Sequence, residues 1–325
     1  MKYIFNKIKK VNQHIERYID TKNNFLLKIT IYFDILYSIL RYGMNLDEYF
    51  QYKFFGKRHY EKKSFFVYRK RMLIVNKYNS FEDMKIFDEK PLFNQEFKEF
   101  VNRRWMNIKN NTFDEFVNFT ESFREFIVKP SNGYYGLGVR KESINNEVNL
   151  RDLYKKLVEE EALIEEVVSQ LDDIAEFNPS SVNTLRVVTM NQGQGRVEVT
   201  TANLRVGNGV DKCADNFHHG GIASLIDIET GIVKTTGIDK YLNTYVKHPI
   251  SGKQIVGYAI PYWNKVKETV KEAALIKPTV GYVGWDVAIG KDGKIIIIEG
   301  NPKADPDVSQ LPDGKGKWHL YKKFV

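Results

Sequence analysis

The sequence contains a single cysteine, Cys213, among 325 residues. One thiol excludes an internal disulfide and a cysteine-rich zinc site, and a reducing, cytoplasmic setting is the simplest interpretation. Long apolar runs are also lacking: the stretch from Phe25 to Leu40 is interrupted by Lys28 and Asp34. It falls short of the ~18 uncharged residues that a membrane span needs. The N-terminus has lysines where a signal peptide would have an apolar run.

Acidic residues are almost absent from the segment between Gln51 and Lys77. Glu61 is the one acid there, against nine basic residues, an excess that equals the +8 net charge of the whole chain. The basic residues are Lys53, Lys57, Arg58, Lys62, Lys63, Arg69, Lys70, Arg71 and Lys77, interleaved with aromatic residues such as Tyr52, Phe54, Phe65 and Phe66. Such a segment can bind an anionic glycan or a membrane surface, or be an ordinary solvated cationic face. No base-reading motif accompanies it, so nucleic acid is not an expected partner.

The texture of the chain changes along its length. Apolar residues recur at helical spacing from Leu26 to Leu40 and Gly43 can end that helix, so residues 1 to about 56 are predicted to be helical. From Phe126 onward, short β-rich runs alternate with glycine turns. The predicted strands are 126–129, 163–165, 185–190, 197–204 and 295–298, and the predicted helices are 150–161 and 263–276. This pattern indicates an α+β domain with antiparallel hairpins rather than a series of βαβ units.

A predicted hairpin near the C-terminus, Gly284 to Pro302, carries the most informative polar residues. If Asp292-Gly293 forms a two-residue turn, Asp286 faces Glu299 and Gly284 faces Asn301. The opposite face is then apolar and belongs to the core. Its residues are Val287, Ile289, Ile296 and Ile298.

Asp286 and Glu299 would repel each other, because opposed residues of a hairpin have Cβ atoms roughly 5 Å apart. The carboxamide of Asn301 lies on the same predicted face, over a glycine without a side chain. Three oxygen-bearing side chains suit a hard cation such as Mg²⁺ better than zinc. The alternative is an exposed polar face on which two acids happen to align.

A lysine and a glycine-rich loop come earlier in the chain. The predicted strand 126–129 ends in Lys129, and the loop that follows contains Ser131, Gly133, Gly136 and Gly138. Glycines let backbone N–H groups approach a phosphate, and the lysine adds positive charge. The spacing is not that of a Walker motif, and the loop leads back into a strand rather than into a helix. It therefore fits either a phosphate-covering loop or an ordinary β-hairpin.

The predicted strand 163–165 is followed by acidic and apolar residues. Glu165, Glu166 and Val168 come first, with Asp172 and Asp173 shortly after. This pattern fits the end of a surface strand. It also fits a hinge that meets an adenine edge through backbone groups and a ribose through a carboxylate.

Taken in order, these elements resemble those of an ATP-grasp enzyme. The Asp286 to Glu299 spacing and Glu299-Gly300-Asn301 look like that family's metal motif. More narrowly, the stretches 178–189 and 215–221 look like the sugar-transfer-associated ATP-grasp family, whose members occur in polysaccharide biosynthesis. The resemblance covers residues 120–311 well and the N-terminal segment weakly. It implies an ATP-grasp domain at 116–325, built from subdomains 116–175 and 176–325 that grip ATP, after a helical, mixed and basic region at 1–115.

The resemblance also implies roles for individual residues. Lys129 would contact the α- and β-phosphates, the 131–138 loop would cover them, and Asp286, Glu299 and Asn301 would hold two Mg²⁺ ions, with Mn²⁺ as an alternative. Glu165, Glu166 and Val168 would form the adenine hinge and Asp172 would contact the ribose. Arg186 and Arg205 would neutralise the transferring phosphoryl group and its acceptor. Asn216, His218 and His219 would line the acceptor side, although one histidine of the pair could be core or surface, and a zinc pair is an alternative.

One expected residue has no obvious counterpart. Relatives in the wider fold carry a further phosphate-binding lysine in the preceding domain. Arg103, Arg104 or Lys109 could substitute for it.

The implied activity is ATP-dependent ligation of a carboxylate to an amine through an acylphosphate, joining an amino acid or amine to a sugar-type carboxylate in surface polysaccharide (capsule) biosynthesis. The alternatives are an ATP-grasp kinase acting on a hydroxyl group and a basic binding protein with a degenerate nucleotide site. The basic window at 51–77 would suit an anionic glycan or the inner membrane face, so the expected location is cytoplasmic or peripheral to that membrane.

Overall fold

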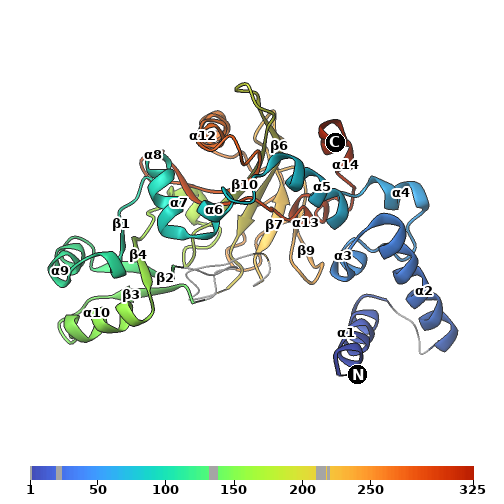
Figure 1. The fold of residues 1–325 in the computed structure, drawn as a ribbon, viewed down its shortest axis with the longest axis horizontal. Helices are drawn as coiled ribbons and strands as arrows, with labels where there is room; N and C mark the ends of the chain where they lie inside the picture. Colours follow the sequence, from blue (N-terminus) through green and yellow to red (C-terminus); the bar gives the residue numbers. More distant parts are fainter. Residues whose placement is uncertain (1, 20–23, 132–137, 210–216, 218–219) are drawn as a thin grey trace. The chain divides into compact units, whose positions relative to one another are not determined.

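The computed structural model describes residues 2–19, 24–131, 138–209, 217 and 220–325, drawn in Figure 1. The chain forms two compact units. Unit 1 joins Met1–Lys77 to Asp305–Val325, and unit 2 is Tyr78–Ala304. The predicted domain boundary between residues 115 and 116 lies within unit 2 and stays a prediction. None of the described helices is long and apolar enough to cross a membrane.

Unit 1 is helical, as the sequence predicted for its N-terminal part. Its N-terminal helices are α1 (Lys2–Tyr18), α2 (Phe25–Tyr42), α3 (Leu46–Gln51), α4 (His59–Ser64) and α5 (Tyr68–Tyr78). The returning C-terminal segment adds α13 (Asp307–Gln310), α14 (Trp318–Tyr321) and η3 (Lys322–Phe324). Gly43 ends α2 in the left-handed conformation at φ 73°, and its N–H donates to the carbonyl of Ile39. The ring of Phe66 stacks on that of Tyr321, which fastens the two segments together.

Many of the aromatic and basic residues of the 51–77 window serve the interior of unit 1. Tyr52, Phe54, Phe65 and Phe66 are buried. Four of the basic residues are engaged within the unit: Lys62 pairs with Asp34 at 2.7 Å, Arg71 pairs with Asp305, and Arg69 and Lys70 donate to backbone carbonyls. The window is therefore not one continuous cationic face.

Unit 2 contains two antiparallel sheets, which confirms the α+β class. The smaller sheet has the order β1-β4-β2-β3, and the larger β11-β10-β5-β6-β7-β8-β9. The strands of the smaller sheet are β1 (Trp105–Asn107), β2 (Glu125–Pro130), β3 (Arg140–Ser143) and β4 (Ala162–Glu166). Those of the larger sheet are β5 (Thr184–Asn191), β6 (Val197–Val206), β7 (Ile222–Leu225), β8 (Gly237–Ile238), β9 (Thr244–Tyr245), β10 (Tyr282–Ile289) and β11 (Ile295–Asn301).

Unit 2 also contains helices, and two of them, α9 and α10, cover one face of the smaller sheet. The helical elements of unit 2 are α6 (Lys85–Asp88), α7 (Lys90–Glu96), α8 (Lys98–Val101), η1 (Ile108–Asn110), α9 (Phe113–Ser122), α10 (Leu150–Glu159), α11 (Asp172–Ala175) and α12 (Trp263–Ile276). Phe116 of α9 and Leu157 of α10 share a buried cluster with Phe126, Val128 and Ile164 of the sheet (Figure 1). Because side chains alternate along a strand, Lys129 and Glu165 fall on the other face.

The hairpin of β10 and β11 has the predicted pairing at its functional end. Asp286 faces Glu299 and Gly284 faces Asn301. The turn is longer than predicted, because Val287 faces Ile297 and Ile289 faces Ile295, and a β-bulge after Asp286 restores the register.

The predicted apolar face was wrong for Ile296, which faces Ala288 and therefore lies on the face of Asp286. Ile295 and Ile297 share the face of Val287 and Ile289 instead, because the bulge shifts β11 by one position. Ile298 lies at the bulge itself, where its predicted face stays a prediction.

Candidate active site

Charged side chains form a row across β11, β10 and β5, the three strands at one edge of the larger sheet. Glu299 of β11, Asp286 of β10 and Arg186 of β5 are consecutive cross-strand partners, and Asn203 of β6 pairs with Arg186. A Cβ atom on Gly284 would lie 3.2 Å from Cδ of Arg186. The absence of a side chain at Gly284 therefore leaves the space that Arg186 fills.

Asp286 is held between two arginines. Arg186 Nε and Nη2 donate to its two carboxylate oxygens at 2.6 and 2.9 Å, and Arg205 Nη1 donates to the same oxygens at 2.8 and 3.0 Å. All three side chains are buried. Paired guanidinium groups on one carboxylate make a rigid, charge-assisted cluster. The structure thus brings the predicted Arg186, Arg205 and Asp286 together.

The two facing carboxyl groups have opposite pKa shifts. Burial would raise the pKa of Asp286, but Arg186 and Arg205 outweigh it and hold that pKa well below its usual range. The pKa of Glu299 is raised by desolvation and by the charge and hydrogen bond of Asp286. Because Glu299 is exposed, the charge of Asp286 raises the pKa of Glu299 more than desolvation does. Arg186 and Arg205 already balance the charge of Asp286, so Glu299 is the carboxyl group whose charge a bound cation would stabilise.

The donor set fits a hard divalent cation. Asp286 and Glu299 offer carboxylate oxygens and Asn301 a carboxamide oxygen, all on one face of the hairpin. The Oδ1 of Asn301 also accepts the N–H of Lys303 at 2.9 Å, which orients the carboxamide. Among the described residues, no three His, Cys, Asp or Glu side chains gather as a metal cluster.

Lys129 lies in a second buried charge cluster. This cluster is on the face of the smaller sheet opposite to α9 and α10. Its Nζ pairs with Glu165 Oε2 at 2.6 Å. Arg103 binds both oxygens of the same carboxylate at 2.9 and 3.0 Å, and Asn94 donates to it at 3.1 Å. Burial would raise the pKa of Glu165, yet Arg103 and Lys129 hold it well below its usual range. Glu165 is thus an ionised anchor for Lys129.

Arg103 connects the smaller sheet to the β10–β11 hairpin. Besides Glu165, its guanidinium donates to the carbonyls of Ile297 and Ile298 on β11 at 2.8 and 3.1 Å. This side chain is buried, and its guanidinium nitrogens already donate hydrogen bonds to Glu165 and to backbone carbonyls. Arg104 is exposed, and Lys109 pairs with Glu161 at the surface. Of the three cations considered for the missing phosphate contact, Arg103 and Lys109 are engaged elsewhere.

A lysine that the sequence analysis missed lies between the two clusters. Lys90, the first residue of α7, donates to the carbonyl of Pro130 at 3.0 Å. Burial has the largest effect and lowers the pKa of Lys90. The negative charges of Glu299 and Glu165 raise that pKa, and the positive charge of Lys129 lowers it. The positive charge of Lys129 also lowers the pKa of Glu299. Both lysines and the carboxylates therefore belong to one electrostatic site.

The helix that carries Lys90 is placed by aromatic packing on β11. A Cβ on Gly300 would lie 2.8 Å from the ring of Phe87 and 3.0 Å from that of Phe93, so α6 and α7 rest directly on the backbone there. The rings of Phe87 and Phe97 also contact Trp285. The sequence signal was Lys90-Pro91, a helix start, which gave no hint of its distant neighbours.

The other predicted residues are less closely associated with this site. Ser131 donates to the carbonyl of Glu161, and Glu166 accepts the N–H of Arg104 at 3.0 Å. Val168 is half-buried, and the exposed Asp172 pairs with Lys291 at 3.4 Å. Asp173 pairs with Lys253 and accepts from Tyr258. Gly138 has a left-handed φ of 77°. Gly133, Gly136, Cys213, Asn216, His218 and His219 lie outside the described residues.

The Glu165 cluster makes a specific contribution to acid stability. Because its folded pKa lies below the usual 4.5, the ionised form stabilises the fold above that value, and this stabilisation is lost as the pH falls below it. We expect Glu165→Gln to lower the free energy of unfolding at pH 7. The difference from the unsubstituted protein should shrink as the pH falls below about 4.5. Urea unfolding across this range measures it.

The matched control is Glu121→Gln, at an exposed position near the end of α9. A difference for Glu165→Gln that stays constant with pH would contradict the ion-pair explanation.

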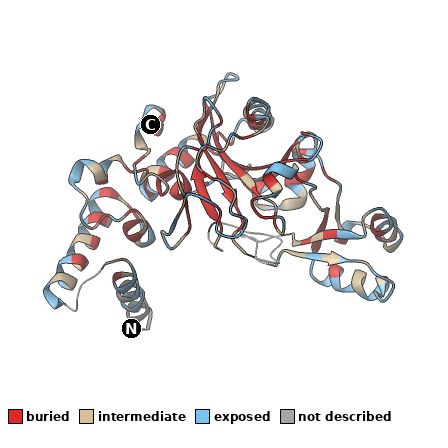
Figure 2. Cartoon of the chain, turned by 180° about the vertical axis from the view of Figure 1, so that it is seen from behind, coloured by how far each residue is buried: buried red, intermediate tan, exposed pale blue. Residues whose placement is uncertain are grey.

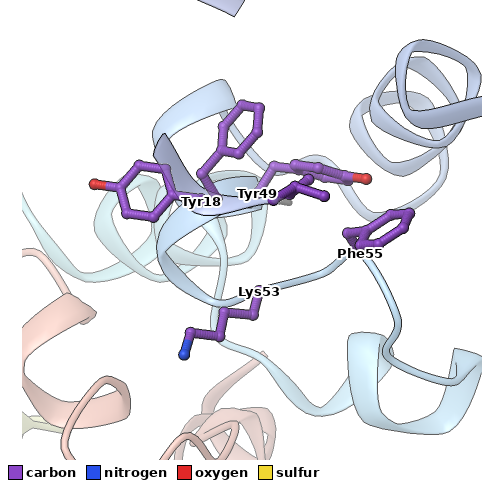
Figure 3. Close-up of a pocket in the computed structure, with 6 residues that line it drawn as sticks. Tyr18, Tyr49, Lys53 and Phe55 are labelled. Atoms are coloured by element: carbon purple, nitrogen blue, oxygen red, sulfur yellow. The ribbon is translucent and has the colours of Figure 1, made fainter. Parts of the chain in front are cut away.

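Unit 1 contains a cavity that is not part of this site. Its volume is about 130 Å³, below the roughly 300 Å³ expected for a small-molecule pocket. It is lined by Tyr18, Ile19, Tyr49, Phe50, Lys53 and Phe55. Figure 3 shows Lys53 extending away from the aromatic rings, so the cavity lacks a converging polar group.

Comparison with protein families decides the classification. The family described as "Sugar-transfer associated ATP-grasp" matches residues 69–324. The chain belongs to this family. The match includes the Lys129 and Asp286 clusters, and the ATP-grasp fold expected from the sequence is confirmed. A comparison with curated proteins gave no match.

Solved structures with similar folds are distant. The ATP-grasp ligase PsnB complexed with minimal precursor is 14% identical, with 76% of this chain and 64% of that chain covered and a TM-score of 0.43. N5-carboxyaminoimidazole ribonucleotide synthetase from Thermotoga maritima is 12% identical, with coverage of 72% and 48% and a TM-score of 0.42. The synthetase from Staphylococcus aureus complexed with ADP is 12% identical, with coverage of 74% and 51% and a TM-score of 0.43. The chain thus spans about half to two thirds of the length of these proteins.

Proposed function

We propose that this ATP-grasp protein is an ATP-dependent carboxylate–amine ligase. The observation that carries the proposal is a chain of contacts. Lys129 pairs with Glu165, and Arg103 joins Glu165 to the β11 carbonyls beside Glu299. Glu299 in turn faces Asp286 and its two arginines. Cations for a polyphosphate and oxygen donors for a hard metal ion thus meet in one site. Phosphoryl transfer needs this combination, because the protein's task is to position the groups and stabilise charge.

The proposed reaction has two steps. An oxygen of a substrate carboxylate attacks the γ-phosphorus of ATP, the bond to the bridging oxygen breaks, and ADP leaves. An amine then attacks the carbonyl carbon of the acylphosphate, and inorganic phosphate leaves with formation of an amide and release of a proton. We infer that the substrates are an amino acid or amine and a sugar-type carboxylate of a surface polysaccharide, and the sugar-transfer association in the family description supports this inference.

Each charged side chain has a part in this proposal. Lys129 and Lys90 contact the phosphates, and Glu165 orients Lys129 instead of touching the adenine. Arg186 and Arg205 keep Asp286 ionised and face the acceptor carboxylate. Asp286, Glu299 and Asn301 would hold Mg²⁺, which would supply positive charge at the phosphate oxygens.

The experiment is a screen for ADP release from ATP and Mg²⁺ with amino acids, uronic acids and amines as acceptors. Hydroxylamine replaces the amine in a second arm, and a hydroxamate product supports the acylphosphate. A phosphorylated acceptor that is stable to hydroxylamine would instead establish a kinase. No ADP release with any acceptor, together with no magnesium-dependent thermal shift with ATP, would establish a binding protein with a degenerate site.

Lys90→Met tests the lysine that only the structure located. A charge-assisted hydrogen bond contributes about 1.5–3 kcal/mol, so the Kd for ATP with Mg²⁺ should rise about 10- to 100-fold. Isothermal titration calorimetry measures the change. Lys98→Met, on the exposed side of α8, is the matched control and should bind like the unsubstituted protein. Equal affinity for both variants would remove Lys90 from the phosphate site.

A further inference from the structure

Helix α2 of unit 1 is apolar on two opposite faces. One face is buried and contains Ile31, Ile35, Ser38 and Tyr42. The other face is exposed to solvent and is here called the α2 stripe. It consists of Phe25, Leu26, Ile29, Phe33, Leu36, Tyr37 and Leu40. A helix that is apolar all round is normally covered all round, so this face calls for a partner.

The α2 stripe is continuous and strongly exposed. Leu26 and Phe33 expose 74% and 68% of their surface, and Leu40 exposes 69%. Spacings of three and four residues keep these side chains in one line along the helix. Figure 2 shows pale-blue, exposed residues along the length of α2. This is a larger apolar surface than scattered surface residues produce.

No acidic group lies in the α2 stripe. The one acid of the helix, Asp34, is taken by Lys62 and by the hydroxyl of Tyr49. At the C-terminal end, Arg41 is exposed, and Arg69 donates to the carbonyls of Leu40 and Arg41. Two arginines therefore border the end of the stripe.

The charge of unit 1 distinguishes between the candidate partners. The unit has 21 lysine or arginine residues and 9 aspartate or glutamate residues, an excess of 12 positive charges. Pairing with a second copy would bring two such units together, and their like charges would repel. An anionic lipid surface is complementary in charge, and each Lys or Arg near it contributes about 1 kcal/mol.

We propose that α2 lies in the interface of an anionic membrane, with the α2 stripe in the acyl region and the basic residues of unit 1 at the headgroups. Helices that bind in this way bury one apolar face while basic groups meet anionic lipid. The proposal goes beyond the ligase function and does not depend on it. It moves the predicted membrane contact from the 51–77 window to α2.

The test is co-sedimentation of the full chain with vesicles. Vesicles of phosphatidylcholine and phosphatidylglycerol should bind the protein, and vesicles of phosphatidylcholine alone should bind it at least about tenfold more weakly. The triple variant Phe33→Ser, Leu36→Ser and Leu40→Ser should lose at least about tenfold of the binding. Its circular dichroism should match that of the unsubstituted protein, because all three side chains are exposed.

The matched control replaces three exposed apolar residues of unit 2, Phe81, Val246 and Ile250, by serine and should keep full binding. Phe33→Trp should show a blue-shifted emission on anionic vesicles only. Absence of binding by the unsubstituted protein, or equal binding of both triple variants, would overturn the proposal. The proposal would also be overturned if the protein did not bind the vesicles and instead formed a dimer in solution that the α2 substitutions dissociate.

Discussion

Replacing Glu299 by glutamine is expected to lower magnesium-dependent ADP release about 10²–10³-fold, the effect of removing one preorganised group from a charge-stabilising site. Glu299 faces Asp286 across the hairpin and lies within the field of Lys129. Glutamine keeps the shape and one oxygen but removes the charge that a divalent cation needs. Steady-state rates at increasing Mg²⁺ concentration measure the loss, and part of it should be recovered at high Mg²⁺.

The same substitution should leave the protein at least as stable as before. The pKa of Glu299 is raised in the folded chain, so its ionised form destabilises the fold in full above the raised pKa. This cost shrinks as the pH falls below the raised pKa and is gone below the ordinary pKa. At pH 7 the thermal midpoint of Glu299→Gln should therefore be unchanged or higher. Asp286 is less suitable for this test, because its loss would leave two buried arginines uncompensated.

Asp292→Asn is the matched control for Glu299→Gln. Asp292 lies on the same hairpin, in the exposed turn, and its replacement should preserve the rate. A Glu299→Gln protein that releases ADP normally with an unchanged Mg²⁺ dependence would exclude the hairpin as the metal site.

The sequence was sufficient to predict the functional end of this hairpin. Opposed Asp286 and Glu299, and the glycine beneath Asn301, follow from alternation along two strands. The turn itself was mispredicted, since Gly290 N–H donates to Lys294 O and three residues lie between them. The bulge at Ile298 compensates for the added residue. A bulge is a local exchange of backbone hydrogen bonds, and no residue in Ile295–Ile298 marks it in the sequence.

Contacts between distant segments were not predictable in the same way. Lys90 reaches the site because Phe87 and Phe93 rest on Gly300, some 200 positions further along the chain. Arg103 was considered as a phosphate contact, yet its guanidinium is used by Glu165 and two carbonyls of β11. Local periodicity identifies elements, whereas the partner of a buried charge depends on how those elements pack.

Arg103→Met should destabilise the chain by about 3 kcal/mol, the lower end of the range for breaking a buried ion pair. The lower end applies because Lys129 still pairs with Glu165 at 2.6 Å. The loss should exceed that of an exposed arginine because the carbonyls of Ile297 and Ile298 also lose a donor. Urea unfolding measures it, and Arg104→Met, at the exposed neighbour, is the matched control.

The double variant Arg103→Met/Glu165→Leu separates stability from function. Replacing both members of a buried pair by apolar side chains is often neutral, so part of the lost stability should return, although Lys129 and Asn94 lose their carboxylate partner. Lys129 then has no carboxylate to orient it, and the affinity for ATP should stay low although the protein is folded. If the double variant regained both stability and ATP affinity, Glu165 would be a structural anion only. If Arg103→Met unfolded like Arg104→Met, Arg103 would not hold the smaller sheet to the β10–β11 hairpin.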